Sequence, residues 1–406
     1  MDKHKGYKIS LLLILIIIIL TNVMNGLLMD TIAHFFLGDR TYVNHHIAFY
    51  LGFAMLLSPI CLIFAPIIGY MIDRYNLVKV TILYNLVMLA IMYGISLIPN
   101  ISDAVFLLLV NITFAGSLLY TVIGVSLLLK FGKPKWSLYF AVIYVFLGCL
   151  THFSSLINVY IIESCQCYGL AYEYPRLIQL MITGCMVLLV LVYPRVSTSH
   201  RSHDFVQSII RIFALKKFRK AIVSFFLVYL IIGFYSQLSP SSMHISFGQL
   251  GISPDDYYGY SKVGLAVSAL LAGLLLKTLS HYVVSLMSLL FMGVGAVLSL
   301  ILVTSVNALW IGTILTHIGF GMLLVSVVYE AFRSVSRKDY GLLAGLMCAV
   351  WIIAMTTSNI FSHYLTYPYY STTFLTQLTA IVILIVLGVL YWMTLRISGR
   401  TSNARK

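Results

Sequence analysis

Charged side chains are scarce in this sequence. Only 9% of its 406 residues are charged, and the acidic residues number 12. A soluble domain has about a quarter of its residues charged, whereas 61% of this chain is hydrophobic. A water-soluble fold has too little interior to hide that much apolar surface. The shortage of charge therefore excludes a soluble protein and indicates that the solvent of this chain is a lipid bilayer.

Several chemical motifs are also missing. The chain has no phosphate-binding loop of the Gly-x-x-x-x-Gly-Lys-Ser/Thr type, so an ATP-driven pump is unsupported. It has neither a two-histidine metal motif nor a convincing Ser/His/Asp grouping. Its six cysteines are scattered, and Cys165-Gln-Cys167 has no second pair to complete a zinc site. We therefore expect no enzymatic activity, no metal site and no cofactor.

Long apolar runs are what the sequence has in abundance. They are continuous rather than alternating, which excludes the strands of a membrane barrel. The first run follows Lys3, Lys5 and Lys8 and is longer than a signal-peptide core, so it is expected to be retained as a span. The fold class is thus an all-α membrane protein with twelve transmembrane helices. These are expected at 9–33, 48–70, 79–98, 104–129, 137–162, 177–194, 221–243, 257–276, 283–304, 308–329, 341–363 and 373–395.

The basic residues are distributed unevenly over the connections. With the N-terminus inside, only Arg40, Arg176 and Lys262 fall on the outer side, which leaves 23 of the 26 Lys and Arg facing the cytoplasm. This is a strong positive-inside pattern. It explains the basic charge by topology and contact with lipid, so no nucleic-acid partner is expected. We expect a multi-pass protein of the plasma (inner) membrane with both termini cytoplasmic.

The longest cytoplasmic connection, 195–220, divides the chain into an N-terminal six-helix bundle at 1–194 and a C-terminal one at 221–406. Within it, apolar and basic residues between Phe205 and Lys217 alternate as in a helix on the membrane surface, although a solvated basic linker is the alternative. Two repeated halves of six spans are the layout of many secondary transporters.

A short polar stretch after the second expected span carries a motif. Gly69-x-x-x-Asp73-Arg74 and Lys79 resemble the loop signature of the major facilitator superfamily, with Asn76 in place of its second glycine. Asparagine tolerates left-handed backbone better than most residues. The resemblance implies two six-helix bundles that this motif latches together on the cytoplasmic side. The helix N-terminus near Tyr340-Gly341 would attract the Asp73 carboxylate; simple topogenic charge is the alternative.

The first expected span shows a second resemblance. The stretch from Asn22 to His34, with Asp30 near its end, is similar to the first helix of the fucose-permease branch and its TsgA-like relatives. That similarity implies a proton site at Asp30, which His34 one turn later could tune. In the sugar symporters of that branch a glutamate in span four completes the site, but Leu119 stands there in this chain.

Polar residues inside other spans are candidates for a substrate cavity. The resemblance implies that spans one, four, seven and ten line it, and the candidates on the last three are Asn111, Tyr120, Tyr235, Gln237 and His317. Gly319 and Gly321 follow His317 and permit close backbone approach. The alternative is that these groups are interhelical hydrogen bonds worth about 1 kcal/mol each.

Two further features concern gating. Pro240 frees a backbone carbonyl in span seven, where it marks either a gating kink or the end of the helix. Glu330 and Arg333 close span ten at i,i+3 spacing and are candidates for an inner-gate ion pair.

Together these features predict a secondary transporter, a permease of the major facilitator type that moves a small-molecule substrate by alternating access. We expect proton-coupled symport through Asp30 and a monomeric protein. A facilitative uniporter, or a membrane sensor or assembly protein that has the same fold without transport, is the alternative.

Overall fold

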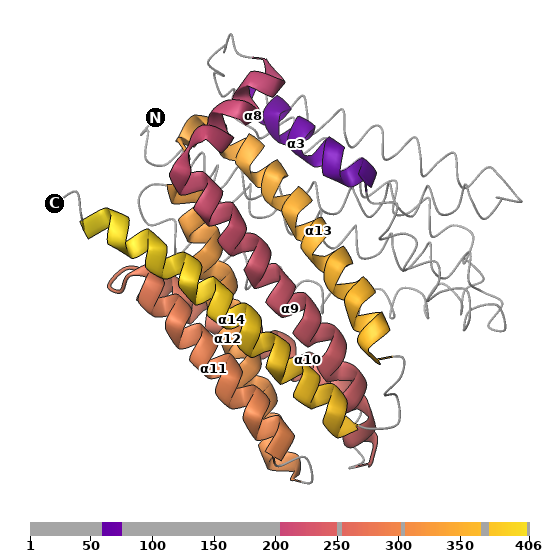
Figure 1. The fold of residues 1–406 in the computed structure, drawn as a ribbon. Helices are drawn as coiled ribbons and strands as arrows, with labels where there is room; N and C mark the ends of the chain where they lie inside the picture. The colour runs from indigo at the N-terminus through magenta and orange to yellow at the C-terminus, as the bar shows by residue number, and fades with distance from the viewer. Residues whose placement is uncertain (1–58, 75–203, 250–253, 302–304, 367–372, 404–406) are drawn as a thin grey trace, which may run out of the picture. The chain divides into compact units, whose positions relative to one another are not determined.

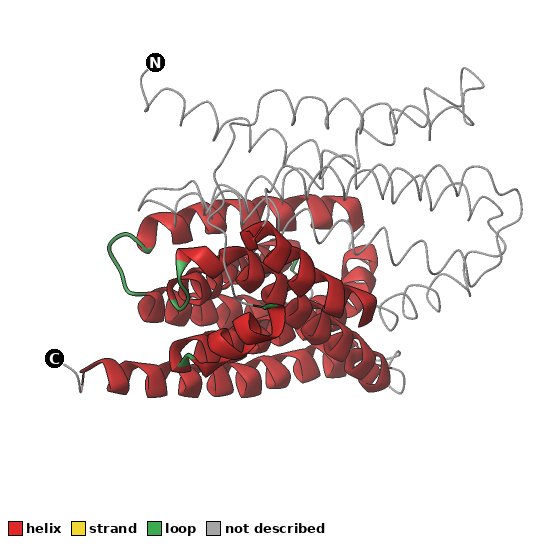
Figure 2. Cartoon of the chain, turned by 90° about the horizontal axis from the view of Figure 1, so that it is seen from above, coloured by secondary structure: helices red, strands yellow, loops and turns green. Residues whose placement is uncertain are grey.

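The structure is a computed structural model that describes residues 59–74, 204–249, 254–301, 305–366 and 373–403. Every regular element within these ranges is helical, and short loops join the helices (Figure 2). Figure 1 gives the element labels, which are in chain order α3 (Pro59–Arg74), α8 (Phe205–Ala214), α9 (Lys216–Gln249), α10 (Pro254–Leu275), α11 (His281–Ile301), α12 (Val306–Arg333), the 3₁₀ turn η1 (Arg337–Asp339), α13 (Tyr340–Thr366) and α14 (Thr373–Asn403).

The chain divides into two compact units. Of the described residues, 59–74, 204–209 and 337–352 belong to the first unit, and the rest belong to the second. The second unit therefore holds α9, α10, α11, α12, α14 and the second half of α13, whereas the first holds α3, η1 and the first half of α13.

The helices agree with the apolar runs of the second half of the sequence. Each of the six spans expected from 221 onward coincides with one long helix. Five helices in the described ranges are long and apolar enough to cross a bilayer, at Lys216–Tyr235, His281–Ser299, Asn307–Arg333, Tyr340–Ser362 and Leu378–Leu395. The protein is thus an integral membrane protein with several spans. The helix α9 begins before its apolar run, at Lys216, and α14 continues past its own run to Asn403. Hydropathy marks where the apolar side chains stop, whereas the helical backbone continues into polar residues.

Two local expectations can be compared directly with the structure. The helix α9 continues through Pro240 to Gln249, so the reading that span seven ends at this proline was wrong. The segment from Phe205 to Ala214 forms a helix, α8, as its pattern predicts. Val206, Ile210 and Phe213 are exposed along one side of α8, next to the exposed Arg211. A position of α8 on the membrane surface stays a prediction.

The core of the second unit is built around α12. This helix packs extensively on α11 and α10 and also contacts α9, while α14 packs on α9 and α11 (Figure 1). One cluster of buried side chains joins α10, α11 and α12, and its members are Ala269, Ala272, Leu276, Val284, Met322 and Val325. Alanine is prominent there because small side chains let helices approach closely in a membrane.

Glycines set the distance between α11 and α12. A Cβ atom on Gly295 would lie 2.7 Å from the backbone nitrogen of Thr316, and one on Gly312 would lie 3.0 Å from that of Ser299. Further along α12, a Cβ on Gly319 would lie 2.6 Å from the carbonyl oxygen of Ser288. These distances leave no room for a side chain. The close approach expected at Gly319 is therefore confirmed.

A matched pair of substitutions in α11 tests this packing. A Cβ at Gly293 would meet no atom within 4 Å, whereas one at Gly295 would meet α12 backbone. We expect Gly295→Ala to lower the unfolding free energy by about 1–3 kcal/mol, the usual cost of overpacking. Gly293→Ala should leave it unchanged or raise it by up to about 1 kcal/mol, because alanine favours helix. Thermal unfolding of the purified variants in detergent measures both, and equal stability of the two would contradict close packing at Gly295.

Candidate functional site

The carboxylate of Asp73, at the end of α3, binds the first turn of α13. The backbone N–H of Gly341 donates to Asp73 Oδ1 at 3.0 Å, and the N–H of Leu342 donates to Oδ2 at 2.7 Å. These amides belong to the second and third residues of α13, whose N–H groups have no partner inside the helix. The partial positive charge of the helix N-terminus favours a carboxylate at this place. Both carboxylate oxygens of Asp73 thus have a donor, at the place where the sequence suggested a partner.

Glycines and small residues let the two backbones meet at this site. A Cβ on Gly69 would lie 2.8 Å from the carbonyl carbon of Gly341, and a Cβ on Gly341 would lie 2.8 Å from Asp73 Oδ1. Further along α13, a Cβ on Gly345 would lie 2.8 Å from the Cα of Pro66, which is two turns from the start of α3. Every one of these positions would clash with any larger residue, so the glycine at the start of the motif has a packing reason of its own.

Aromatic and basic groups flank the motif. Arg74 Nη1 donates to the hydroxyl of Tyr70 at 2.6 Å, and the guanidinium lies 5.7 Å from the centre of the same ring. The ring of Tyr70 also makes an edge-to-face contact with Phe205 of α8, at 5.4 Å between ring centres. Arg74 therefore contacts a residue of its own helix, one turn earlier, while Asp73 reaches another helix.

A second group of candidate residues gathers where α9 meets α12. The buried Tyr235 places its hydroxyl 3.4 Å from Thr316 Oγ1, and its ring lies 5.3 Å from that of Phe320. Because Thr316 donates its own proton to the Gly312 carbonyl at 2.8 Å, Tyr235 is the donor in this contact. The half-buried His317 has Nδ1 2.8 Å from the Thr313 carbonyl and its ring 5.7 Å from that of Phe320. Phe320 thus links two residues that the sequence singled out separately, Tyr235 and His317.

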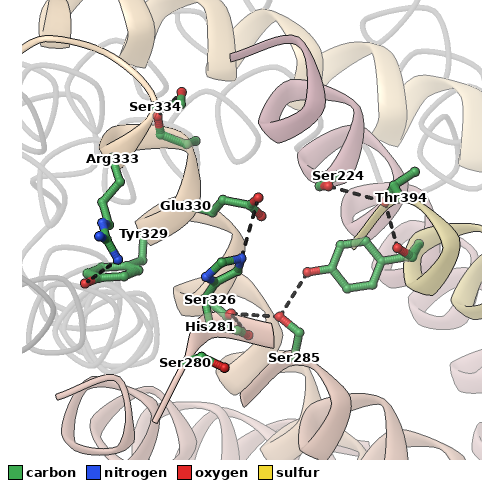
Figure 3. Close-up of polar contacts among 12 residues, drawn as sticks. Ser224, Ser280, His281, Ser285, Ser326, Tyr329, Glu330, Arg333, Ser334 and Thr394 are labelled. Atoms are coloured by element: carbon green, nitrogen blue, oxygen red, sulfur yellow. Dashed lines mark hydrogen bonds and ion pairs between the residues drawn. The ribbon is translucent and has the colours of Figure 1, made fainter. Parts of the chain in front are cut away.

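The expected ion pair at the end of α12 is replaced by other contacts. Figure 3 shows Glu330 and Arg333 pointing to different partners. Arg333 lies over the ring of Tyr329, 5.4 Å from its centre. Glu330 Oε1 lies 3.7 Å from Nε2 of His281, the first residue of α11. The i,i+3 spacing only indicates which residues of one helix can pair. The partner of Glu330 instead comes from the neighbouring helix α11.

The sequence missed several residues of this region. His281 fell two positions before the expected start of span nine, so it was read as part of a connection. Ser285, Ser326 and Tyr391 stand in apolar runs, and only the packing of α11, α12 and α14 brings their hydroxyl groups together. Figure 3 labels Ser285 and Ser326 at this contact. A count of serines within the apolar runs would have been the only indication of these contacts.

Other predicted site residues lie outside the described ranges. These are the proton-coupling candidates Asp30 and His34, the cavity candidates Asn111 and Tyr120, and Asn76 and Lys79 of the latch motif. Gln237 lies on α9, two residues beyond Tyr235, where the apolar part of this helix ends.

Comparison with solved structures identifies the fold. The human organic anion transporter MFSD10 matches with a TM-score of 0.69 at 12% identity, over 96% of this chain and 100% of that one. The fucose:proton symporter FucP of E. coli matches with a TM-score of 0.65 at 11% identity, over 95% and 99%. The fold is that of the major facilitator superfamily.

A third structure with this fold is a bacterial homologue of the iron transporter ferroportin, in its outward-facing state. It matches with a TM-score of 0.66 at 13% identity, over 96% of this chain and 99% of that one. No family model and no curated protein matches the sequence. The likeness of this chain to major facilitator transporters is thus one of fold.

Removal of the Asp73 carboxylate should loosen α13. Asp73→Ala leaves the amides of Gly341 and Leu342 without their charged acceptor, and we expect a loss of about 2 kcal/mol of unfolding free energy. Arg74→Gln is the control, since Arg74 contacts Tyr70 within α3 and exposed or half-exposed contacts contribute little. Thermal unfolding in detergent compares the two. An Asp73→Ala protein as stable as Arg74→Gln would show that the carboxylate does not anchor α13.

Proposed function

We propose that this protein is a secondary transporter that moves a small solute across the membrane by alternating access. Its fold matches transporters over almost the whole chain. The proposal rests above all on the bond between Asp73 and the first turn of α13. This bond joins the polar motif that follows one span to the start of another span nearly 270 residues later.

The chemistry of this bond suits a latch that opens and closes. Two charge-assisted hydrogen bonds contribute a few kcal/mol together, which is enough to favour one state without locking it. The bond sits at helix ends, where water can replace Asp73 as the partner of the two amides once the helices separate. In the proposed cycle this contact closes the cytoplasmic side, and its loss accompanies opening on that side.

The residues at the junction of α9 and α12 support the proposal that the solute is polar. Tyr235 provides a hydroxyl, His317 an imidazole and Phe320 an aromatic face, all within a largely apolar helix pair. Such a mixture binds small molecules that have both polar edges and an apolar surface. We therefore propose that Tyr235 and His317 contribute to the solute site, together with Asn111, Tyr120 and Gln237.

Proton coupling through Asp30, tuned by His34, completes the proposal. An ionisable residue inside a span is costly, so such a residue is a candidate for a function, and Asp30 lies within the first expected span. Facilitated diffusion is the second candidate, because Leu119 stands where the fucose-permease pattern has a glutamate. In that case solute would move down its own gradient and no carboxylate would be required.

Reconstituted protein tests both versions. Liposomes that contain the purified protein and an internal pH dye receive pooled solutes by chemical class, with and without an imposed proton gradient. We expect one class to move protons inward together with solute, and Asp30→Asn to abolish the proton movement because an amide cannot exchange the proton. Asp103→Asn, in an expected outer loop, is the control and should behave as the parent.

The possible outcomes separate the two candidates. Solute uptake without proton movement, unchanged in Asp30→Asn, would establish facilitated diffusion and reject coupling at Asp30. An absence of uptake for every class, with the protein shown to be folded, would contradict a transport function.

A further inference from the structure

Glu330 is a buried carboxylate that the proposed transport cycle does not use. Its side chain is 15% exposed, and it lies three residues before the end of α12. One carboxylate oxygen, Oε2, is buried and has no hydrogen-bond partner in the described part of the chain. The other oxygen, Oε1, has His281 Nε2 at 3.7 Å, which is longer than a hydrogen bond. An ionised carboxylate is expensive to bury in this condition.

Asp73 shows the surroundings that suit an ionised carboxylate in this protein. Each of its two oxygens receives a backbone N–H within 3.0 Å at a helix N-terminus. Glu330 instead lies near the C-terminal end of its helix, where the partial charge of the helix is negative. Among the described residues, no donor lies within hydrogen-bond distance of the Glu330 carboxylate, and the helix end beside it does not stabilise a negative charge. A proton on the carboxyl group is the simplest ligand that satisfies the unpartnered oxygen.

A chain of buried hydroxyl groups holds His281 next to Glu330 (Figure 3). The hydroxyl of Tyr391 donates to Ser285 Oγ at 3.0 Å. Ser285 and Ser326 share a hydrogen bond of 2.8 Å, and Ser326 donates to the carbonyl oxygen of His281 at 3.1 Å. Because Ser326 uses its proton on His281, Ser285 is the donor to Ser326. The hydrogen bonds therefore run in one direction from α14 to the first residue of α11, and they fix the backbone that carries the imidazole.

The imidazole of His281 also connects Glu330 to solvent. The side chain of His281 is 32% exposed, about twice as exposed as that of Glu330. Histidine takes up and releases protons near neutral pH. A proton from water can therefore bind to the imidazole and pass from Nε2 to Oε1, which leaves a neutral imidazole and a neutral carboxyl group. The 3.7 Å separation needs only a small side-chain movement to become a hydrogen bond.

Other ionisable groups surround this pair on the packed helices. Lys220 of α9 is close enough to act electrostatically on Glu330, and Arg333 of α12 acts on His281. Tyr391 of α14 interacts electrostatically with Glu330. Tyr329 is occupied by Arg333, and the exposed Lys277 lies in the turn between α10 and α11. Protonation of Glu330 would remove a negative charge from the neighbourhood of Lys220 and Arg333.

We propose that Glu330 and His281 form a proton-binding site in the second compact unit, in addition to the one proposed at Asp30. Glu330 is the residue that holds the proton, and His281 is the residue through which the proton enters and leaves. Tyr391, Ser285 and Ser326 are positioning residues that keep the imidazole in reach. The site joins α11 and α12, so its occupancy by a proton alters a contact between two helices of the same unit.

The composition of the chain allows a direct test. It contains only three glutamates, Glu163, Glu173 and Glu330. The full-length protein labelled with ¹³C at the glutamate side-chain carboxyl carbon should therefore give three signals in detergent micelles. We expect the Glu330 signal to titrate together with the His281 ring signals, because two interacting groups share their titration steps. No transported solute is needed, so the result does not depend on the proposed function.

Variants assign the signals and provide controls. Glu330→Gln should remove the titrating signal, whereas Glu163→Gln and Glu173→Gln should leave it in place. These two controls assign Glu330 by elimination even if Glu330→Gln does not fold. His281→Gln should shift the midpoint of the Glu330 titration, and Ser326→Ala should shift it less, since it only loosens the imidazole. A Glu330 signal that stays at its ionised position throughout the titration, or a midpoint unaffected by His281→Gln, would overturn the proposal.

Discussion

Helices in a bilayer gain little from burying apolar side chains against one another, because lipid is equally apolar. Their contacts depend on how closely backbones approach, and this constraint organises the described part of the structure. Gly295 and Gly312 bring α11 against α12, and Gly69 and Gly341 bring α3 against α13. Serine and threonine hydroxyls in these interfaces donate hydrogen bonds to backbone carbonyls of their own helix, as Ser288 does to Val284. Hydrogen bonds between helices become possible only after the glycines have made the helices meet.

The two carboxylates at helix ends show what such contacts can do. Asp73 has a backbone N–H donor for each carboxylate oxygen and joins α3 to α13. Glu330 has one distant partner and one orphaned oxygen, so its environment favours an exchangeable proton. The same functional group thus serves as an anchor in one compact unit and as a binding site in the other. The difference arises from helix polarity, since Asp73 faces a helix N-terminus and Glu330 sits at a C-terminus.

From residue 221 onward, the sequence predicted the described helices well because each long apolar run has one stable conformation in a bilayer. It also predicted the partner of Asp73, since only a helix N-terminus offers free amides to a carboxylate. It did not predict the partner of Glu330, because spacing within α12 favoured Arg333, whereas the actual neighbour begins another helix. Which residues of different helices come into contact depends on how the helices pack. No sequence pattern indicates that Tyr391, Ser285 and Ser326 form hydrogen bonds with one another.

The central claim, that α3 and α13 separate during transport, is tested most directly by joining them. Leu62 of α3 and Cys348 of α13 both pack against Ile352. A variant with Leu62→Cys that keeps Cys348 as its only native cysteine can be joined by a short, cleavable thiol cross-linker in liposomes. The account predicts that cross-linking stops solute transport and that cleavage restores it. Transport at the same rate before and after cross-linking would contradict alternating access through this contact.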